Sequence, residues 1–449
     1  MITPGKLIRG LSLTQATSVN MIYMVGIGPF ITIPFVVGAM KGPQCMLAWL
    51  LGALLAFMDG SVWAELGAKW PEAGGSYVFL QKLYNNKWGR LMSFLLIWQT
   101  CIQAPLVIAS GAIGFAKYLT YLIPLTDLEK KGVSGALVVL VVIMLYREVT
   151  SIGKISVFLW IVTGLTFLWL IGSGFMGFDA KKAFTFSKDA FDLSPIFFVG
   201  LGQASLQTVY SYLGYYNVCN LGGEIENPER NIPRAIFISI AGIAVLYLGM
   251  QLVVLGAMPW QKIAGSEFVI SSYFEQIYNV PVANFATALI LIIAAASLFA
   301  GTLGYSRIPY AAALDGNFFP VFAKTHPTKK FPHVSLLVIG GISFAFSLLF
   351  KLQDVIKAII TMRILVQFVG QSAGVLYWHY TKPKEERPYK MKLFPIPAIL
   401  GIVIWLFIMF TSDFKFVAGA IGIILLGAIV YITMVNKQFF KPALNVIDN

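Results

Sequence analysis

The sequence contains few charged residues, which make up 12% of its 449 positions, whereas an ordinary soluble domain has about 25%. Hydrophobic residues account for 58% of the chain, and its mean hydropathy is +0.77. Such a chain cannot cover its surface with polar side chains. The composition therefore predicts a protein embedded in a lipid bilayer and argues against catalytic machinery in an aqueous domain.

Cysteine and histidine are scarce too, with three residues of each. Cys45, Cys101 and Cys219 lie inside apolar segments, which argues against a disulfide framework or a zinc site. The histidines fall in or beside expected loops, and the apolar segments contain no Ser/His, Asp/Asp or His/Glu set. We therefore expect no enzyme activity, no cofactor and no cluster of metal-ligating side chains.

The net charge of +13 would suit a nucleic-acid-binding protein if the positive residues were clustered. Instead, most lysines and arginines fall in alternate loops, on the side of the N-terminus. This asymmetry is typical of a multi-pass membrane protein whose positive loops face the cytoplasm. We expect cytoplasmic N- and C-termini, no nucleic acid partner and, from the short termini, a bacterial inner (cell) membrane.

Twelve segments satisfy the requirement of about 20 mainly apolar residues for a membrane-spanning helix. They are 13–40, 43–67, 91–123, 133–150, 154–177, 194–221, 232–257, 283–313, 334–351, 354–380, 395–412 and 415–436. The connections between them are short. The predicted fold is all-α and integral to the membrane, with 12 transmembrane helices.

Two of these segments contain residues that interrupt a helix: the first at 26–30 (GIGPF) and the sixth at 210–214. Irregular backbone survives inside a bilayer only where protein or a cavity satisfies its polar groups. The two segments are five apart, which fits inverted repeats at 1–180 and 181–385, followed by two additional helices at 386–449. Transporters of this kind hold their solute between the broken helices.

The first break suits a carboxylate. Gly26 and Gly28 allow a ligand to approach bare backbone, and Pro29 fits the first turn of the restarting helix. The N-terminus of that helix offers unpaired amides and the positive end of a dipole. A Gly/Pro kink used only for packing is the alternative.

The sixth segment suits an ammonium group. If Gly214 lets the helix unwind, the freed carbonyls of Tyr210, Ser211 and Tyr212 can accept hydrogen bonds, and Tyr210 or Tyr215 can close over the ligand. The alternative is an aromatic stripe that packs against neighbouring helices. Together the two breaks describe a site for the backbone of an amino acid, made by Val25, Gly26, Ile27, Gly28, Tyr210, Ser211, Tyr212, Leu213 and Gly214.

Five motifs resemble the amino acid-polyamine-organocation superfamily, in particular its L-type amino acid transporter-like permeases. The motifs are GIGPF at 26–30, WAELG at 63–67 with PEAGGSY at 71–77, EIENPERNIPR at 224–234, SR and DG at 306–307 and 315–316, and RPYK and FP at 387–390 and 394–395. One departure is Pro29, which stands where the family usually has isoleucine and removes one amide donor.

The resemblance implies a leucine-transporter-like core and secondary transport of amino acids by alternating access, through exchange or ion coupling. A non-transporting amino acid sensor, or a carrier of polyamines or cationic amino acids, stays open. Thr163 occupies the place of a coupling lysine found in several relatives. Ser297 and Thr302 form a candidate sodium site, although such hydroxyls more often bond their own backbone.

The resemblance also bears on partners and gates. No cysteine lies between Tyr118 and Val133, where relatives attach a glycoprotein, so we expect only the amino acid and the lipid bilayer as partners. Arg363 either binds anionic groups, pairs with a gating carboxylate, or serves as a structural strut. Asp59 either relays protons or pairs with a nearby residue. The expected gate residues are Phe30, Tyr215, Arg363 and, as ion pairs at the inner helix ends, Glu65 and Glu224.

Overall fold

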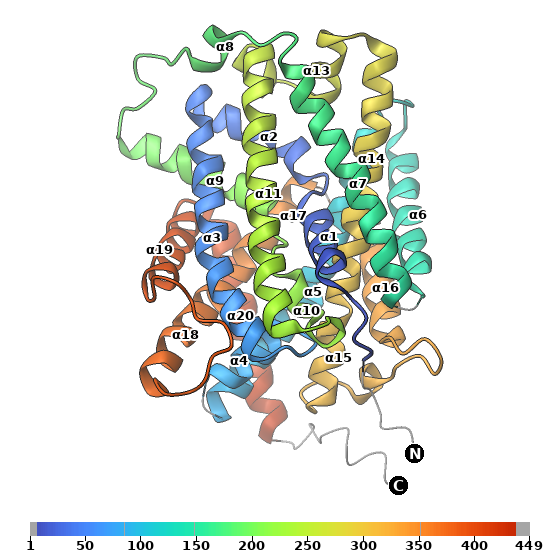
Figure 1. Cartoon of the computed structure of the whole chain (residues 1–449), viewed down its shortest axis with the longest axis vertical. Helices are drawn as coiled ribbons and strands as arrows, with labels where there is room; N and C mark the ends of the chain where they lie inside the picture. The colour runs from blue at the N-terminus through green and yellow to red at the C-terminus, as the bar shows by residue number, and fades with distance from the viewer. Residues whose placement is uncertain (1–6, 85, 148, 351, 437–449) are drawn as a thin grey trace.

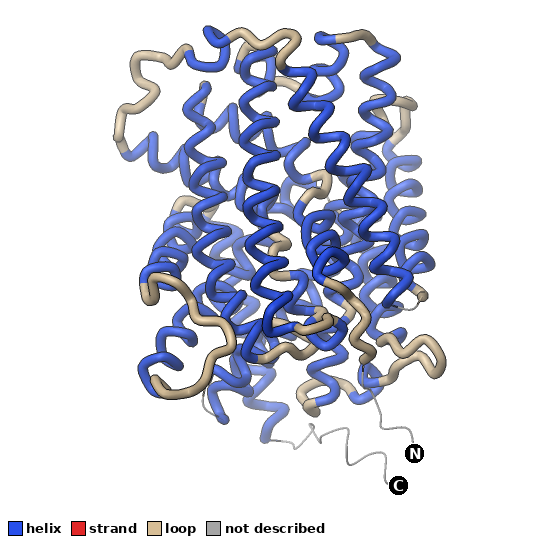
Figure 2. Tube along the Cα trace, in the orientation of Figure 1, coloured by secondary structure: helices blue, strands red, loops and turns tan. Residues whose placement is uncertain are grey.

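The computed structural model describes residues 7–84, 86–147, 149–350 and 352–436, which form helices and connecting loops with no β-strand (Figures 1 and 2). A helix occupies each of the twelve predicted ranges. The helices are α1 (Leu13–Met24), α2 (Gly28–Met40), α3 (Met46–Lys69), α4 (Ser76–Leu83), α5 (Asn86–Leu119), α6 (Asp127–Leu145), α7 (Val149–Gly174), α8 (Ala180–Phe184), α9 (Pro195–Tyr212), α10 (Asn217–Asn220), α11 (Pro228–Ala257), α12 (Trp260–Ala264), α13 (Val269–Ile277), α14 (Val280–Tyr305), α15 (Arg307–Leu314), α16 (His333–Leu349), α17 (Leu352–Arg363), α18 (Gly370–Thr381), α19 (Ile396–Phe410) and α20 (Phe414–Asn436).

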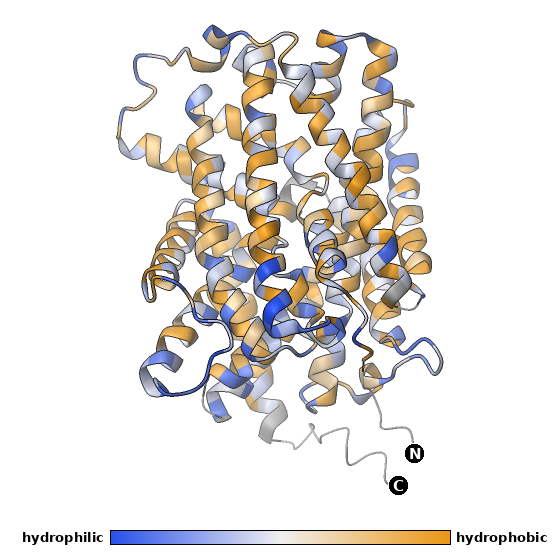
Figure 3. Ribbon diagram, in the orientation of Figure 1, coloured by the Kyte–Doolittle hydropathy of each residue, from blue (hydrophilic) through white to orange (hydrophobic). Residues whose placement is uncertain are grey.

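Seven of the described helices are long and apolar enough to cross a membrane, or eight if the bent pair α1 and α2 forms one span. Hydrophobic residues cover the outer helices through most of their length (Figure 3). On α20, Leu425, Ile429 and Ile432 are each 59% exposed, a pattern that suits lipid rather than water. The all-α membrane fold is confirmed, whereas the number twelve and the inverted repeat stay predictions.

The broken first segment lies inside the bundle. α1 packs against α7, α11 and α14, while α2 packs against α9. The described chain begins and ends at the lower end of Figure 1, beside α4, α10 and α15, and we call this the terminal end. The opposite end carries α8 and α13.

Local sequence explains where several helices begin. Ser12 and Gln15 form a capping box before α1, because each side chain bonds the other residue's backbone N–H. Thr126 and Glu129 form a second one before α6. The first turns of α2, α9, α11 and α14 contain proline, whose missing N–H has no helical acceptor there.

Candidate solute-binding site

The first membrane segment is broken where the sequence predicts. α1 ends at Met24 and α2 begins at Gly28, with a bend of 45° between them. Pro29 occupies the first turn of α2. The amides of Gly26, Ile27 and Gly28 have no acceptor among the described residues. The break therefore presents unpaired N–H groups at the positive end of a helix dipole.

The two glycines of this break bring other spans against bare backbone. A Cβ atom on Gly26 would lie 2.6 Å from the hydroxyl oxygen of Ser297 in α14. A Cβ atom on Gly28 would lie 3.1 Å from the ring of Tyr210 in α9. A larger residue at either position would require Ser297 or Tyr210 to shift, so the site is tightly packed at both glycines.

The second break begins later than predicted. α9 is helical through Tyr212, and the backbone interruption spans 213–216. Leu213 still donates its N–H to α9 (2.9 Å), so the expected unwinding at 210–212 is wrong. Gly214 makes the break, because its φ of +125° is readily adopted only by glycine. The last turn of α9 nevertheless leaves carbonyl groups without helical partners.

Asn20 of α1 bonds the backbone of the second break. Its side-chain amide donates to the carbonyl oxygen of Tyr215 (2.6 Å) and accepts from the N–H of Val218 (2.8 Å). Asn20 is fully buried. It therefore satisfies polar groups that a bilayer interior offers no water to solvate.

Tyr247 of α11 joins the two breaks. Its hydroxyl lies 2.7 Å from the carbonyl oxygen of Met24 and 3.2 Å from that of Ser211. Neither Tyr247 nor Asn20 is among the residues predicted from the sequence. The available signal was a polar side chain inside an apolar segment, and such residues usually find their partners across helices.

A cavity of about 60 Å³ lies where the two breaks meet, and residues of α5, α14 and α17 complete its wall. The predicted solute contacts that line this cavity are Gly26, Ile27, Gly28, Tyr210, Ser211 and Leu213. Val25, Tyr212 and Gly214 are not in its wall. Arg363 is the charged residue among the described ones that line it, so no carboxylate faces the cavity.

Several hydroxyl groups lie in the cavity wall or on neighbouring residues. The hydroxyl oxygen of Tyr210 lies 3.1 Å from that of Ser110 in α5. Ser297 donates to the carbonyl oxygen of Tyr23 (3.1 Å), while the buried hydroxyl of Thr302 has no partner among the described residues. Those residues contain no group of three or more His, Cys, Asp or Glu side chains that could hold a metal. A sodium site at Ser297 and Thr302 stays a prediction.

A comparison with protein-family models gives a match over residues 11–436 to the family described as "Amino acid permease". The chain belongs to this family. The aspartate-proton symporter of Bacillus subtilis is 26% identical to the permease over 88% of this chain and 78% of the relative. The glutamate/serine transporter AimA of the same organism is 25% identical (93% and 81%), as is the human cystine/glutamate transporter (88% and 77%). These relatives are transporters rather than enzymes, so the permease is a multi-pass membrane protein of an amino acid transporter family.

Two buried glutamates form ion pairs at the terminal end of the permease. Glu224 and Arg307 form a bidentate pair with N–O distances of 2.7 and 2.9 Å, and their side chains are 1% and 2% exposed. One Glu65 oxygen lies 2.7 Å from His379 Nε2 and 3.3 Å from Arg387 Nε. Both glutamates thus form the expected ion pairs, while their role as a gate stays a prediction.

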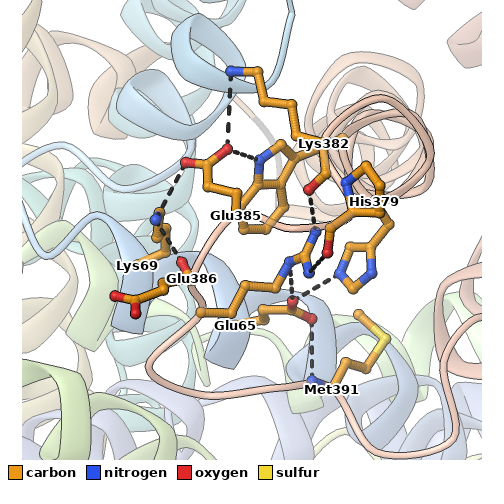
Figure 4. Close-up of polar contacts among 10 residues, drawn as sticks. Glu65, Lys69, His379, Lys382, Glu385, Glu386 and Met391 are labelled. Atoms are coloured by element: carbon orange, nitrogen blue, oxygen red, sulfur yellow. Dashed lines mark hydrogen bonds and ion pairs between the residues drawn. The ribbon is translucent and has the colours of Figure 1, made fainter.

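The Glu65 pair ties α3 to the loop after α18 (Figure 4). The second Glu65 oxygen accepts the N–H of Met391 at 3.1 Å. At the other side of this cluster, partial burial raises the pKa of Glu385, but hydrogen bonds from Trp378 and Lys69 outweigh that effect and hold the pKa below its ordinary value. Glu385 therefore stays negative at neutral pH and keeps the loop attached to Lys69.

Of the other predicted gate residues, Arg363 lines the cavity, whereas Phe30 and Tyr215 lie outside its wall. Phe30 packs against Phe167 of α7, with ring centroids 5.5 Å apart. The Tyr215 hydroxyl donates to Asp59 of α3, which also accepts from the indole of Trp63 at 2.8 Å. Asp59 thus has the local partners that one of its two interpretations requires. Whether Phe30 or Tyr215 gates the pathway stays a prediction.

Proposed function

We propose that this permease carries an amino acid across the cell membrane by alternating access, with the solute held between the two helix breaks. The observation that carries the proposal is that both breaks, far apart in the sequence, line one cavity. The substrate carboxylate accepts hydrogen bonds from the free amides of Gly26, Ile27 and Gly28.

The ammonium group of the substrate faces the end of α9. Of the predicted carbonyls whose residues line the cavity, that of Tyr210 accepts no hydrogen bond from the described residues, whereas that of Ser211 already accepts one from Tyr247. A carbonyl oxygen has two lone pairs, so Ser211 keeps one for the solute. Tyr210 closes the site from the side of α5, where Ser110 holds its hydroxyl.

The same proposal includes twelve spans, arranged as two inverted five-helix repeats followed by two further helices. It places the terminal end in the cytoplasm. The positive residues of the loops support this orientation. The permease works without a covalently attached partner chain. The names of its relatives cover acidic, cationic and sulfur-containing amino acids, so they support an amino acid substrate without selecting one.

Uptake of labelled amino acids into proteoliposomes containing the purified permease tests the proposal. We expect saturable uptake of at least one of the twenty standard amino acids, and counterflow when the vesicles are preloaded with the same compound. Protein-free liposomes provide the control. A complete lack of transport, with and without proton and sodium gradients, would reject the proposal.

A non-transporting sensor is the second candidate, because it would bind the solute with the same site. Thermal stabilisation of the detergent-purified permease by an amino acid, without any flux in proteoliposomes, would favour that function. A channel would instead give flux without saturation or counterflow.

A further inference from the structure

Arg363 brings a positive charge to the wall of the cavity without a carboxylate in direct contact with it. The side chain is 4% exposed, and it forms no ion pair with any described Asp or Glu. Buried charges in proteins are normally paired, because an unpaired one loses its hydration without compensation. The absence of a carboxylate in contact with Arg363 therefore needs an explanation.

Neutral groups hold the guanidinium in place. Its Nε donates to the side-chain oxygen of Gln367 at 2.6 Å, and Nη1 donates to the hydroxyl of Tyr216. The ring centroids of Tyr216 and Phe368 lie 4.9 and 5.5 Å from its central carbon. These contacts fix the plane of the fork but supply no negative charge, and Nη2 has no acceptor among the described residues. A fixed guanidinium with a free donor suits a carboxylate.

We propose that Arg363 binds the side-chain carboxylate of the substrate, so that the permease selects acidic amino acids. This inference rests on the proposed function, in which the amides at the start of α2 hold the α-carboxylate and leave Arg363 for a second anionic group. A neutral amino acid carries no net charge and leaves the guanidinium without a carboxylate in contact. An acidic amino acid carries one negative charge and completes the pair, whereas a cationic solute is repelled.

The experiment compares aspartate with asparagine and glutamate with glutamine, since each pair differs mainly in side-chain charge. We measure inhibition of labelled-substrate uptake in proteoliposomes and, in parallel, thermal stabilisation of the purified permease. A hydrogen bond to a charged group contributes roughly 1.5–3 kcal/mol. The acidic member of each pair should therefore reach half-maximal inhibition or stabilisation at a concentration at least about tenfold lower than the amide. Arg363→Gln should remove this preference and leave the response to asparagine within about threefold.

Arg147→Gln is the matched control, because Arg147 is exposed between α6 and α7. Equal potency of aspartate and asparagine in the natural protein overturns the inference but leaves the proposed function intact. Equal weakening of both by Arg363→Gln also overturns it, since Arg363 would then hold the α-carboxylate or only the fold. If no amino acid is transported, the proposed function fails, and the stabilisation measurement still decides the inference. If Arg363→Gln does not fold, the natural protein's preference decides it.

Discussion

At the scale of single residues, the site depends on side chains that are missing as much as on those present. Gly28 lets the ring of Tyr210 lie directly over the start of α2. A Cβ atom there would approach this ring to 3.1 Å, which is tighter than ordinary van der Waals contact. The missing side chain at position 28 therefore keeps the Tyr210 ring close to the amides that we assign to the carboxylate.

We expect Gly28→Val to reduce uptake by about 100-fold, since displacement of a binding group by about 1 Å can cost that much. Gly38→Ala is the matched control on the same helix, because its new Cβ atom would meet Ala264 at an ordinary 3.7 Å. Both variants should elute as folded protein in size-exclusion chromatography. Normal uptake by Gly28→Val would remove the assignment of the carboxylate to α2.

Tyr247→Phe tests the link between the two breaks. Removing the hydroxyl leaves the buried carbonyls of Met24 and Ser211 without this donor, and an unsatisfied buried polar group costs about 1–3 kcal/mol. We expect a lower midpoint of thermal unfolding in detergent. Tyr380→Phe is the control, because Tyr380 is 89% exposed. Identical midpoints for the two variants would show that the Tyr247 hydroxyl does not stabilise the break.

At the scale of elements, the sequence located the first break more accurately than the second. GIGPF at 26–30 stops a helix by local chemistry alone, since glycine and proline act within their own turn. The end of α9 instead depends on a residue distant in the chain: Asn20 bonds the carbonyl of Tyr215 and the amide of Val218. No local sequence pattern predicts such a contact.

The direction of individual side chains was equally hard to predict. Tyr210 and Tyr215 are both aromatic residues beside the break, yet Tyr210 lines the cavity and Tyr215 points to Asp59. The difference follows from the path of the backbone around Gly214. A helical projection of the sequence does not describe this path. Sequence spacing therefore identified the two elements of the site, but it did not select which of their residues face the solute.

Gly214→Ala tests whether the second helix break requires glycine. An alanine at φ +125° is strained, and its Cβ atom would lie 2.8 Å from the ring of Tyr23. We expect a lower unfolding midpoint and loss of uptake. Gly419→Ala on α20 should change neither, because a Cβ atom there meets no atom within 4 Å. A Gly214→Ala protein as stable and active as the natural one would contradict the assigned break.

At the scale of the whole molecule, alternating access requires the terminal end to open and close. In this structure Glu65 ties α3 to His379 and Arg387, and Glu224 is paired with Arg307. The backbone N–H groups of residues 10 and 11 also donate to the carbonyl of Glu224, each at 3.0 Å. If the terminal end opens along these contacts, it must break buried ion pairs.

Removing one partner of a buried pair destabilises the arrangement that contains it, so Glu65→Gln should shift the permease toward states with an open terminal end. Cys219 of α10 is a natural probe, since it is 1% exposed and lies against Trp63 and Gly67 near that end. We expect its alkylation by a small maleimide to accelerate several-fold, as measured by mass spectrometry of the cysteine-containing peptides.

Cys45, fully buried before α3 at the other end of that helix, serves as the internal reference for general loosening. Glu229→Gln is the matched control, because Glu229 is exposed in the first turn of α11. Faster reaction of both cysteines in Glu65→Gln would indicate partial unfolding rather than opening. An unchanged rate at Cys219, together with normal uptake, would mean that the Glu65 pair holds the loop after α18 in place without controlling access to the cavity.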